Sequence, residues 1–215
     1  MKTILCYGDS ITWGYIPGNL GRLPLDQRWP SVLARALGPD YEVIAEGLRG
    51  RYTVHDEPFR PGRSGADLLQ PILESHAPVD LLILLLGTND VLHFPELTAY
   101  DAARGIETLC KLAQASEAGP DGGEPRILLI APPRIGKLSD ELSLMCHGKP
   151  EHALDFARHY RSVAGDRGLA FLDAAEVTEP SPVDGVHLDA QGQRRLGEAV
   201  ARAVLQIFSH PTALG

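Results

Sequence analysis

Three residues far apart in the chain have the types and the spacing that acyl transfer requires. Ser10 follows a short apolar run, in the stretch CYGDSITWGY (residues 6–15). A serine hydroxyl becomes a good nucleophile only when a base removes its proton, and the imidazole of His187 suits that task. Asp184 precedes His187 by three residues, which lets its carboxylate reach the histidine Nδ1 and fix the tautomer. We predict Ser10, His187 and Asp184 as nucleophile, base and orienting acid.

The same reaction needs donors for the negative charge that develops on the substrate carbonyl oxygen. We expect the backbone N–H groups of Ser10 and Gly50 and the side-chain amide of Asn89 to supply them. Glycine at position 50 suits a backbone amide that must approach a ligand closely.

The elements that must position these residues alternate between strand and helix. Strands are expected at residues 3–7, 41–45, 79–86, 126–131 and 169–172. Helices are expected at residues 27–37, 65–76 with a break or kink near Pro71, 98–114, 151–166 and 190–208. Thr98 and Asp101 have the spacing of a capping box. This alternation indicates a parallel sheet with helices on both faces, and ligands bind such sheets beyond the carboxyl ends of the strands.

Four short blocks resemble the signature blocks of the GDSL/SGNH hydrolases, a family named for its Ser, Gly, Asn and His. They are GDSIT (residues 8–12), Gly50, GTND (87–90) and DGVH (184–187). TILCYGDSITWGY, EGLRGRYT and LLGTND resemble, more narrowly, the bacterial arylesterase/acyltransferase branch. The resemblance implies a flavodoxin-like three-layer α/β/α sandwich around a central parallel five-stranded sheet. It also implies a catalytic triad of Ser10, Asp184 and His187, and an oxyanion hole formed by Ser10, Gly50 and Asn89.

Two positions depart from the family pattern. Ile11 stands where GDSL has leucine, a conservative change, and Arg49 stands just before the glycine of the second block. A long cation there either narrows the pocket or points to solvent. We expect Asp9, Trp13 and Arg49 beside the substrate, although Asp9 also fits a structural role on nearby amides and Trp13 also fits the core.

Simpler explanations exist for several of these residues. Ser10 fits the N-cap of a short helix, Gly50 a turn glycine, and His187 a surface histidine like the others. Asn89 and Asp90 fit turn formers at a strand end, and we assign Asp90 that role. The four blocks in register favour catalytic roles for Ser10, Gly50, Asn89 and His187.

Two long loops, residues 15–27 and 132–148, should form the walls of the acyl and alcohol sites. We read Met145 and Cys146 in the second loop as packing residues. The walls favour small aryl or short-chain alkyl esters, with carbohydrate acetyl-esterase and lysophospholipase or thioesterase activities as alternatives in the same family. This preference rests on the apolar residues of the two loops, which are Ile16, Leu20, Leu23, Ile135, Leu138, Leu142 and Leu144.

Composition excludes several classes of partner. The formal net charge of −8, without any basic run, argues against nucleic acid and anionic membranes. The chain shows no signal-peptide pattern, and its three cysteines have no metal-ligand spacing, so we expect a cytoplasmic protein without metal or cofactor. We expect a homo-oligomer, because apolar loops on an acidic chain favour burial by a neighbour.

Residues 1–210 are expected to form a single domain, followed by a tail at residues 211–215. A flavodoxin-like receiver is the non-enzyme alternative, with Asp9 and Asp90 as its acidic residues. A receiver needs a lysine just after the last strand, and none follows Leu172. A non-catalytic binding module would have no need of the full triad.

Overall fold

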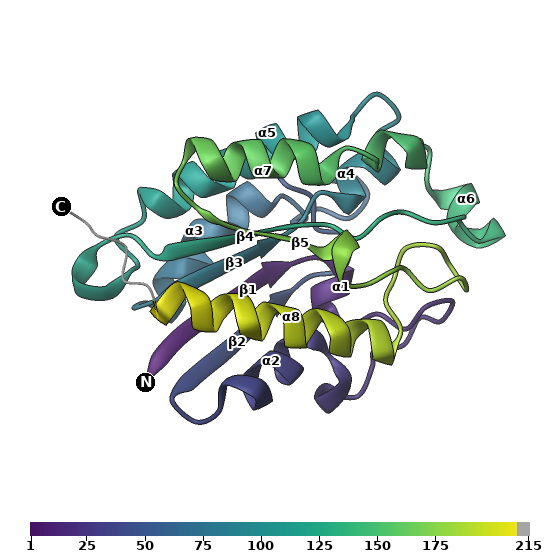
Figure 1. The fold of residues 1–215 in the computed structure, drawn as a ribbon. Helices are drawn as coiled ribbons and strands as arrows, with labels where there is room; N and C mark the ends of the chain where they lie inside the picture. Colours follow the sequence, from purple (N-terminus) through teal and green to yellow (C-terminus); the bar gives the residue numbers. More distant parts are fainter. Residues whose placement is uncertain (210–215) are drawn as a thin grey trace.

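The computed structural model describes residues 1–209 and shows five parallel strands in the order β2-β1-β3-β4-β5 (Figure 1). This is the order of a doubly wound, flavodoxin-like sheet, and it reverses between β1 and β3. The expected fold class is confirmed. The strands are β1 Lys2–Gly8, β2 Tyr41–Gly47, β3 Leu81–Leu85, β4 Arg126–Ala131 and β5 Ala170–Asp173.

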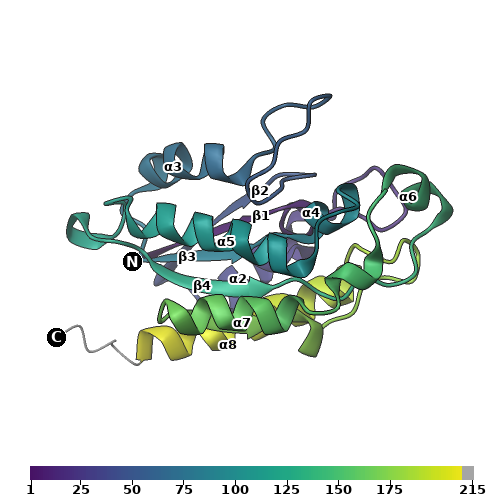
Figure 2. The same ribbon diagram turned by 90° about the horizontal axis from the view of Figure 1, so that it is seen from above.

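Helices cover both faces of the sheet (Figures 1 and 2). On one face α3, α5 and α7 pack on the side chains of the central strands, and on the other face α2 and α8 do so. The strand β3 is buried on both faces, which explains its unbroken apolar run. The helices are α1 Ser10–Trp13, α2 Trp29–Leu37, α3 Gly65–His76, α4 Thr88–His93, α5 Ala99–Gln114, α6 Asp140–Met145, α7 Phe156–Asp166 and α8 Ala190–Ser209.

Most predicted elements are present, with corrections at prolines. The helix expected from residue 27 begins at Trp29, because Pro30 fits only the first turn. The helix expected from residue 151 begins at Phe156, after the 3₁₀ turn Pro150–Ala153. The break expected near Pro71 is absent, because α3 is continuous through this exposed residue, and the alternative of a kink there stays a prediction. The capping box of Thr98 and Asp101 is confirmed.

Three short helices, α1, α4 and α6, were not predicted, and all lie near the carboxyl edge of the sheet (Figure 1). No helix within residues 1–209 is long and apolar enough to span a membrane. The single-domain boundary stays a prediction, and the tail at residues 211–215 lies outside the described residues.

Candidate active site

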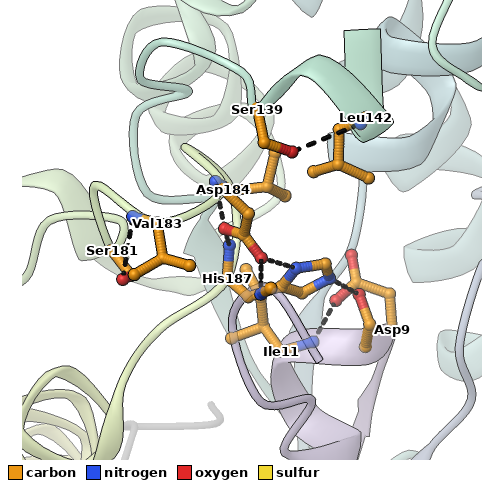
Figure 3. Close-up of polar contacts among 11 residues, drawn as sticks. Asp9, Ile11, Ser139, Leu142, Ser181, Val183, Asp184 and His187 are labelled. Atoms are coloured by element: carbon orange, nitrogen blue, oxygen red, sulfur yellow. Dashed lines mark hydrogen bonds and ion pairs between the residues drawn. The ribbon is translucent and has the colours of Figure 1, made fainter. Parts of the chain in front are cut away.

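Ser10, His187 and Asp184 form one hydrogen-bonded line. The Ser10 Oγ lies 3.0 Å from the His187 Nε2, and the His187 Nδ1 lies 2.7 Å from the Asp184 Oδ2. Figure 3 shows the His187 ring between the Asp184 carboxylate and the start of α1, where Asp9 and Ile11 are labelled. Ser10 and His187 are each 8% exposed, so a substrate can reach them while most water is kept away.

The turn from β1 into α1 holds Ser10 at this edge. Asp9 is the N-cap of α1 and accepts a hydrogen bond from the Ile11 N–H at 2.9 Å, so the N-cap explanation of Ser10 is wrong. The turn is tight at Gly8, where a Cβ would lie 2.1 Å from the Thr12 Oγ1. Only glycine fits between the end of β1 and the first turn of α1, and the tight turn leaves the Ser10 hydroxyl directed at His187.

The loop after β5 holds the histidine. The Asp184 Oδ1 accepts the N–H groups of Val186 and His187 at 3.0 and 2.9 Å, and its Oδ2 also accepts the Gly18 N–H at 3.2 Å. Burial alone would raise the pKa of Asp184, but the hydrogen bonds from His187 and the backbone hold this pKa below its usual range. The Tyr15 ring stacks on the His187 ring, with centroids 4.2 Å apart. The Asp184 carboxylate therefore stays ionised. The His187 imidazole is held by a hydrogen bond to Asp184 at its edge and by the Tyr15 ring on its face.

The three predicted oxyanion donors lie on neighbouring strand ends. Asn89 is in the first turn of α4, directly after β3, and its Nδ2 donates to the Arg51 carbonyl at 3.0 Å and lies 3.5 Å from the Asp9 Oδ2. Gly50 has φ +73°, in the turn that the Arg51 N–H closes on the Leu48 carbonyl at 3.1 Å. Asp9 directly precedes Ser10, and Arg51 directly follows Gly50. The hydrogen bonds of the Asn89 side chain therefore connect Asn89 to both segments that carry the other two donors.

Arg51 is a buried residue of the site that the sequence did not reveal. Arg51 is 2% exposed, and its guanidinium lies over the Tyr7 ring at 3.9 Å and donates to the carbonyls of Gly8 and Glu46. Gly8 is the last residue of β1 and Glu46 the last but one of β2, so one side chain joins two strand ends to the loop that carries Gly50. Nothing in the stretch GLRGRYT distinguishes a buried arginine from an exposed one.

Asp90 is not a turn former. It lies in α4, is fully buried, and accepts hydrogen bonds from the Thr53 N–H and from the Thr53 hydroxyl at 2.6 Å. Burial raises the pKa of Asp90 to about 7 against the lowering effect of these hydrogen bonds, and it raises the pKa of Asp9 to about 6 against the lowering effect of the Ile11 N–H. No group of three or more His, Cys, Asp or Glu residues within the described chain could hold a metal ion.

A cavity of about 110 Å³ lies next to the triad, between the two predicted wall loops. Arg49 lines it, whereas the predicted pocket residues Asp9 and Trp13 are not among its lining residues. The lining is more polar than the sequence indicated. It consists of Tyr15, Gly18, Asn19, Leu20, Arg49, Ser139, Glu141, Leu142, Met145 and Asp184.

The loop of residues 132–148 contains α6, which projects beyond the end of the sheet (Figure 2). Hydrogen bonds fasten it to the histidine loop, from the Gly136 N–H to the Gly185 carbonyl at 2.7 Å and from the Ser139 N–H to the Asp184 carbonyl at 3.3 Å. Cys146 is buried in packing, as expected. Met145 is 61% exposed, so its interpretation as a packing residue was wrong.

A doubly wound α/β sheet here brings a serine, a histidine and an aspartate into line beyond its strand ends, which is the arrangement expected of a serine hydrolase. The family model of the GDSL-like lipase/acylhydrolases matches residues 6–195. The chain belongs to this family, and it is a carboxylic ester hydrolase.

Solved structures agree with this classification. The aryl esterase of M. smegmatis is 36% identical with a TM-score of 0.91, over 96% of this chain and 100% of the other. A carbohydrate acetylesterase from Sinorhizobium meliloti is 33% identical with a TM-score of 0.91, over 97% and 100%. A carbohydrate acetylesterase family member from the same organism is 41% identical with a TM-score of 0.88, over 96% and 100%. A search of curated proteins found no significant match.

Proposed function

We propose that the protein hydrolyses small carboxylic esters through an acyl-enzyme on Ser10. The observation that carries the proposal is the line from the Ser10 Oγ through His187 to Asp184, with distances of 3.0 and 2.7 Å. His187 removes the serine proton as the hydroxyl attacks the ester carbonyl, and the same proton then goes to the leaving alcohol. Asp184 keeps the imidazole in the tautomer whose Nε2 is free to accept. Water, activated by His187, releases the acid in the second half-reaction.

The developing oxyanion is bound by the N–H groups of Ser10 and Gly50 and by the Asn89 Nδ2. Before substrate binds, the Nδ2 donates to the Arg51 carbonyl at 3.0 Å and has only a 3.5 Å contact with Asp9. The amide is thus held in place by one good hydrogen bond, while its second N–H is poorly satisfied. A donor held in this way loses little when it turns to a new negative charge.

We propose aryl or short-chain alkyl esters as substrates. The small cavity on the histidine side of the site supports a small alcohol part on the ester. Acetylated carbohydrates are a second candidate. The polar cavity residues Asn19, Ser139 and Glu141 favour them, and two of the similar structures are described as carbohydrate acetylesterases.

Three linked proposals concern the setting of the reaction. Transfer of the acyl group to added alcohols would follow from a walled cavity that limits water. Assembly into a homo-oligomer is supported by the exposed apolar residues Leu20, Leu144 and Met145 near the cavity. A cytoplasmic location is supported by three free, buried cysteines.

Labelling with a fluorophosphonate tests the nucleophile, because this reagent modifies activated serines. We expect one label on Ser10, found by mass spectrometry, and none in Ser10→Ala, which should also lose hydrolysis of phenyl acetate. Ser139→Ala is the matched control, since its hydroxyl caps α6 and does not contact His187. An unlabelled Ser10 in protein that hydrolyses phenyl acetate would refute the proposal. Parallel assays of aryl acetates and acetylated sugars rank the two substrate classes.

A further inference from the structure

Arg49 is a cation at the cavity wall with aromatic contacts alone. Its guanidinium lies over the rings of Trp13 and Tyr15, 5.3 and 5.0 Å from their centroids. It forms no hydrogen bond and no ion pair with any part of residues 1–209. Stacking on rings uses the face of a guanidinium and leaves the N–H groups at its edge free. Several donors of Arg49 are therefore available to a molecule in the cavity.

The cavity adjoins the histidine side of the triad. Tyr15 and Asp184 both line it, Tyr15 stacks on the His187 ring, and Asp184 accepts the hydrogen bond from that ring. In the proposed mechanism His187 delivers a proton to the leaving alcohol, so the alcohol part of the ester must lie on this side. Arg49 consequently faces the space into which the alcohol part extends.

Two acidic groups share the cavity with Arg49, and neither neutralises it. The Asp184 carboxylate is occupied by His187 and by backbone N–H groups. Glu141 is exposed on α6 and forms no ion pair with any described residue, so water solvates its charge. Arg49 is held against two rings, whereas Glu141 can turn outward. Arg49 is the only cation among the described residues that line this cavity, and its position is fixed by the two rings.

We propose that Arg49 recognises a carboxylate on the alcohol part of the ester substrate. The inference rests on the esterase mechanism above and adds a substrate class to it. A planar guanidinium pairs with a carboxylate through two parallel N–H···O bonds, which gives orientation as well as affinity. The aromatic residues that hold Arg49 also suit an aryl ring carrying that carboxylate.

Two esters of nearly equal size separate charge from shape: 4-acetoxybenzoate and its neutral counterpart 4-acetoxybenzamide. The measured quantity is the ratio of kcat/KM for the charged ester to kcat/KM for the neutral one. We expect Arg49→Gln to lower this ratio about tenfold, mainly through KM, the scale of one charge-assisted hydrogen bond in a partly exposed site. Glu141→Gln should raise the ratio, because it removes a repelling charge.

Arg22→Gln is the matched control. Arg22 also lies over the Trp13 ring, at 4.8 Å, but it does not line the cavity, so the ratio should stay unchanged. An unchanged ratio in Arg49→Gln, or equal falls in the Arg49 and Arg22 variants, would overturn the inference. So would a charge effect found only with monophenyl succinate, whose carboxylate is on the acyl part. Failure of the wild-type protein to hydrolyse either acetate would instead refute the esterase proposal itself.

Discussion

Two regions meet at the carboxyl edge of the sheet, and they are built differently. The floor consists of residues 8–10, 48–51 and 87–90, at the carboxyl ends of β1, β2 and β3. Asn89, Asp90 and Arg51 of this floor are buried and hydrogen-bonded to backbone groups, and the buried Ser10 hydroxyl bonds to His187. The walls consist of residues 15–27 and 132–148, and they expose large side chains such as Leu20 and Met145.

The difference between floor and walls separates two tasks. A buried donor whose partners are fixed can stabilise a charge without reorganising, and this is what the chemical step requires. An exposed side chain on a loop contributes shape and charge to substrate binding, and it can change without loss of the fold. Arg49 belongs to the floor through its backbone and to the wall through its side chain. We therefore expect changes in the floor to alter kcat or stability, and changes in the walls to alter the choice of substrate.

The largest effect is expected for Asn89→Ala. Removing one oxyanion donor costs about 10²–10³ in kcat, or roughly 3–4 kcal/mol, while KM stays within a few-fold because the charge exists only in the transition state. Asn89→Asp should be as poor or worse, because its carboxylate would lie beside the forming oxyanion and beside Asp9. Steady-state kinetics and thermal melts decide the matter. Near wild-type kcat in the aspartate variant would remove Asn89 from this role.

A smaller effect, on stability, is expected from Asp90. The carboxyl ionises near 3.8 in the unfolded chain, but burial raises its pKa to about 7 in the folded protein. Between these values the folded state binds more protons, so stability falls as the pH rises, by up to about 1.4 kcal/mol per pH unit. Asp90→Asn has no such ionisation. The unfolding free energy of Asp90→Asn minus that of wild type should therefore grow by about 2 kcal/mol from pH 5 to pH 7, because only the wild type loses stability over this range.

Asp101→Asn is the control for this pH dependence. Its pKa is lowered by the Thr98 hydroxyl, so the group is ionised in both states above pH 5. Loss of the capping box should give a constant offset from pH 5 to pH 8. Urea unfolding at several pH values measures both variants, and a constant offset for Asp90→Asn as well would contradict the shift.

A positioning role for Arg51 predicts a loss of about tenfold in kcat for Arg51→Lys, the scale of one lost hydrogen bond to a charged group. The ammonium cannot hold the carbonyls of Gly8 and Glu46 as the guanidinium does, so the loop that carries Gly50 and supports Asn89 would shift. If Arg51 acts through Asn89, the loss in kcat should largely vanish when Arg51→Lys is combined with Asn89→Ala. Additive losses would show that Arg51 does not act through Asn89, and a lower melting temperature with normal kcat would show a purely structural role.

Sequence patterns were sufficient for the strands, the fold class and the grouping of Ser10, Asp184 and His187. Apolar runs and chemistry-bearing residues after strands are local features, and the parallel sheet brings them together. Arg51 and Asp90 could not be predicted in the same way. A charged residue is normally exposed, and only the packed structure shows that backbone carbonyls surround Arg51 or that Thr53 faces Asp90.

The walls were the least predictable region for a related reason. The sequence shows which loop residues are apolar but not which way each one faces. Leu23 is buried and Leu144 is 81% exposed, and neither lines the cavity. The N-cap Ser139 is the only sequence signal that predicts the short helix α6, and serines of this kind are common in loops.

The smallest effect is expected for Met145→Ala. The side chain lines the cavity yet is largely exposed, so its removal should change the unfolding free energy by no more than about 0.5 kcal/mol. Its loss widens the wall, so kcat/KM for 2-naphthyl acetate should rise relative to methyl acetate, by roughly two- to fivefold, less than a buried methylene would give. Leu144→Ala on the same helix is the control, since Leu144 is exposed but does not line the cavity, and it should leave this ratio unchanged. If Met145→Ala instead lowers kcat for both esters as much as a change in the floor does, or destabilises the protein by several kcal/mol, the wall is not a separate region. Met145 would then be a packing residue on which the catalytic geometry depends, and the division between floor and walls would fail at the point where the two loops meet the cavity.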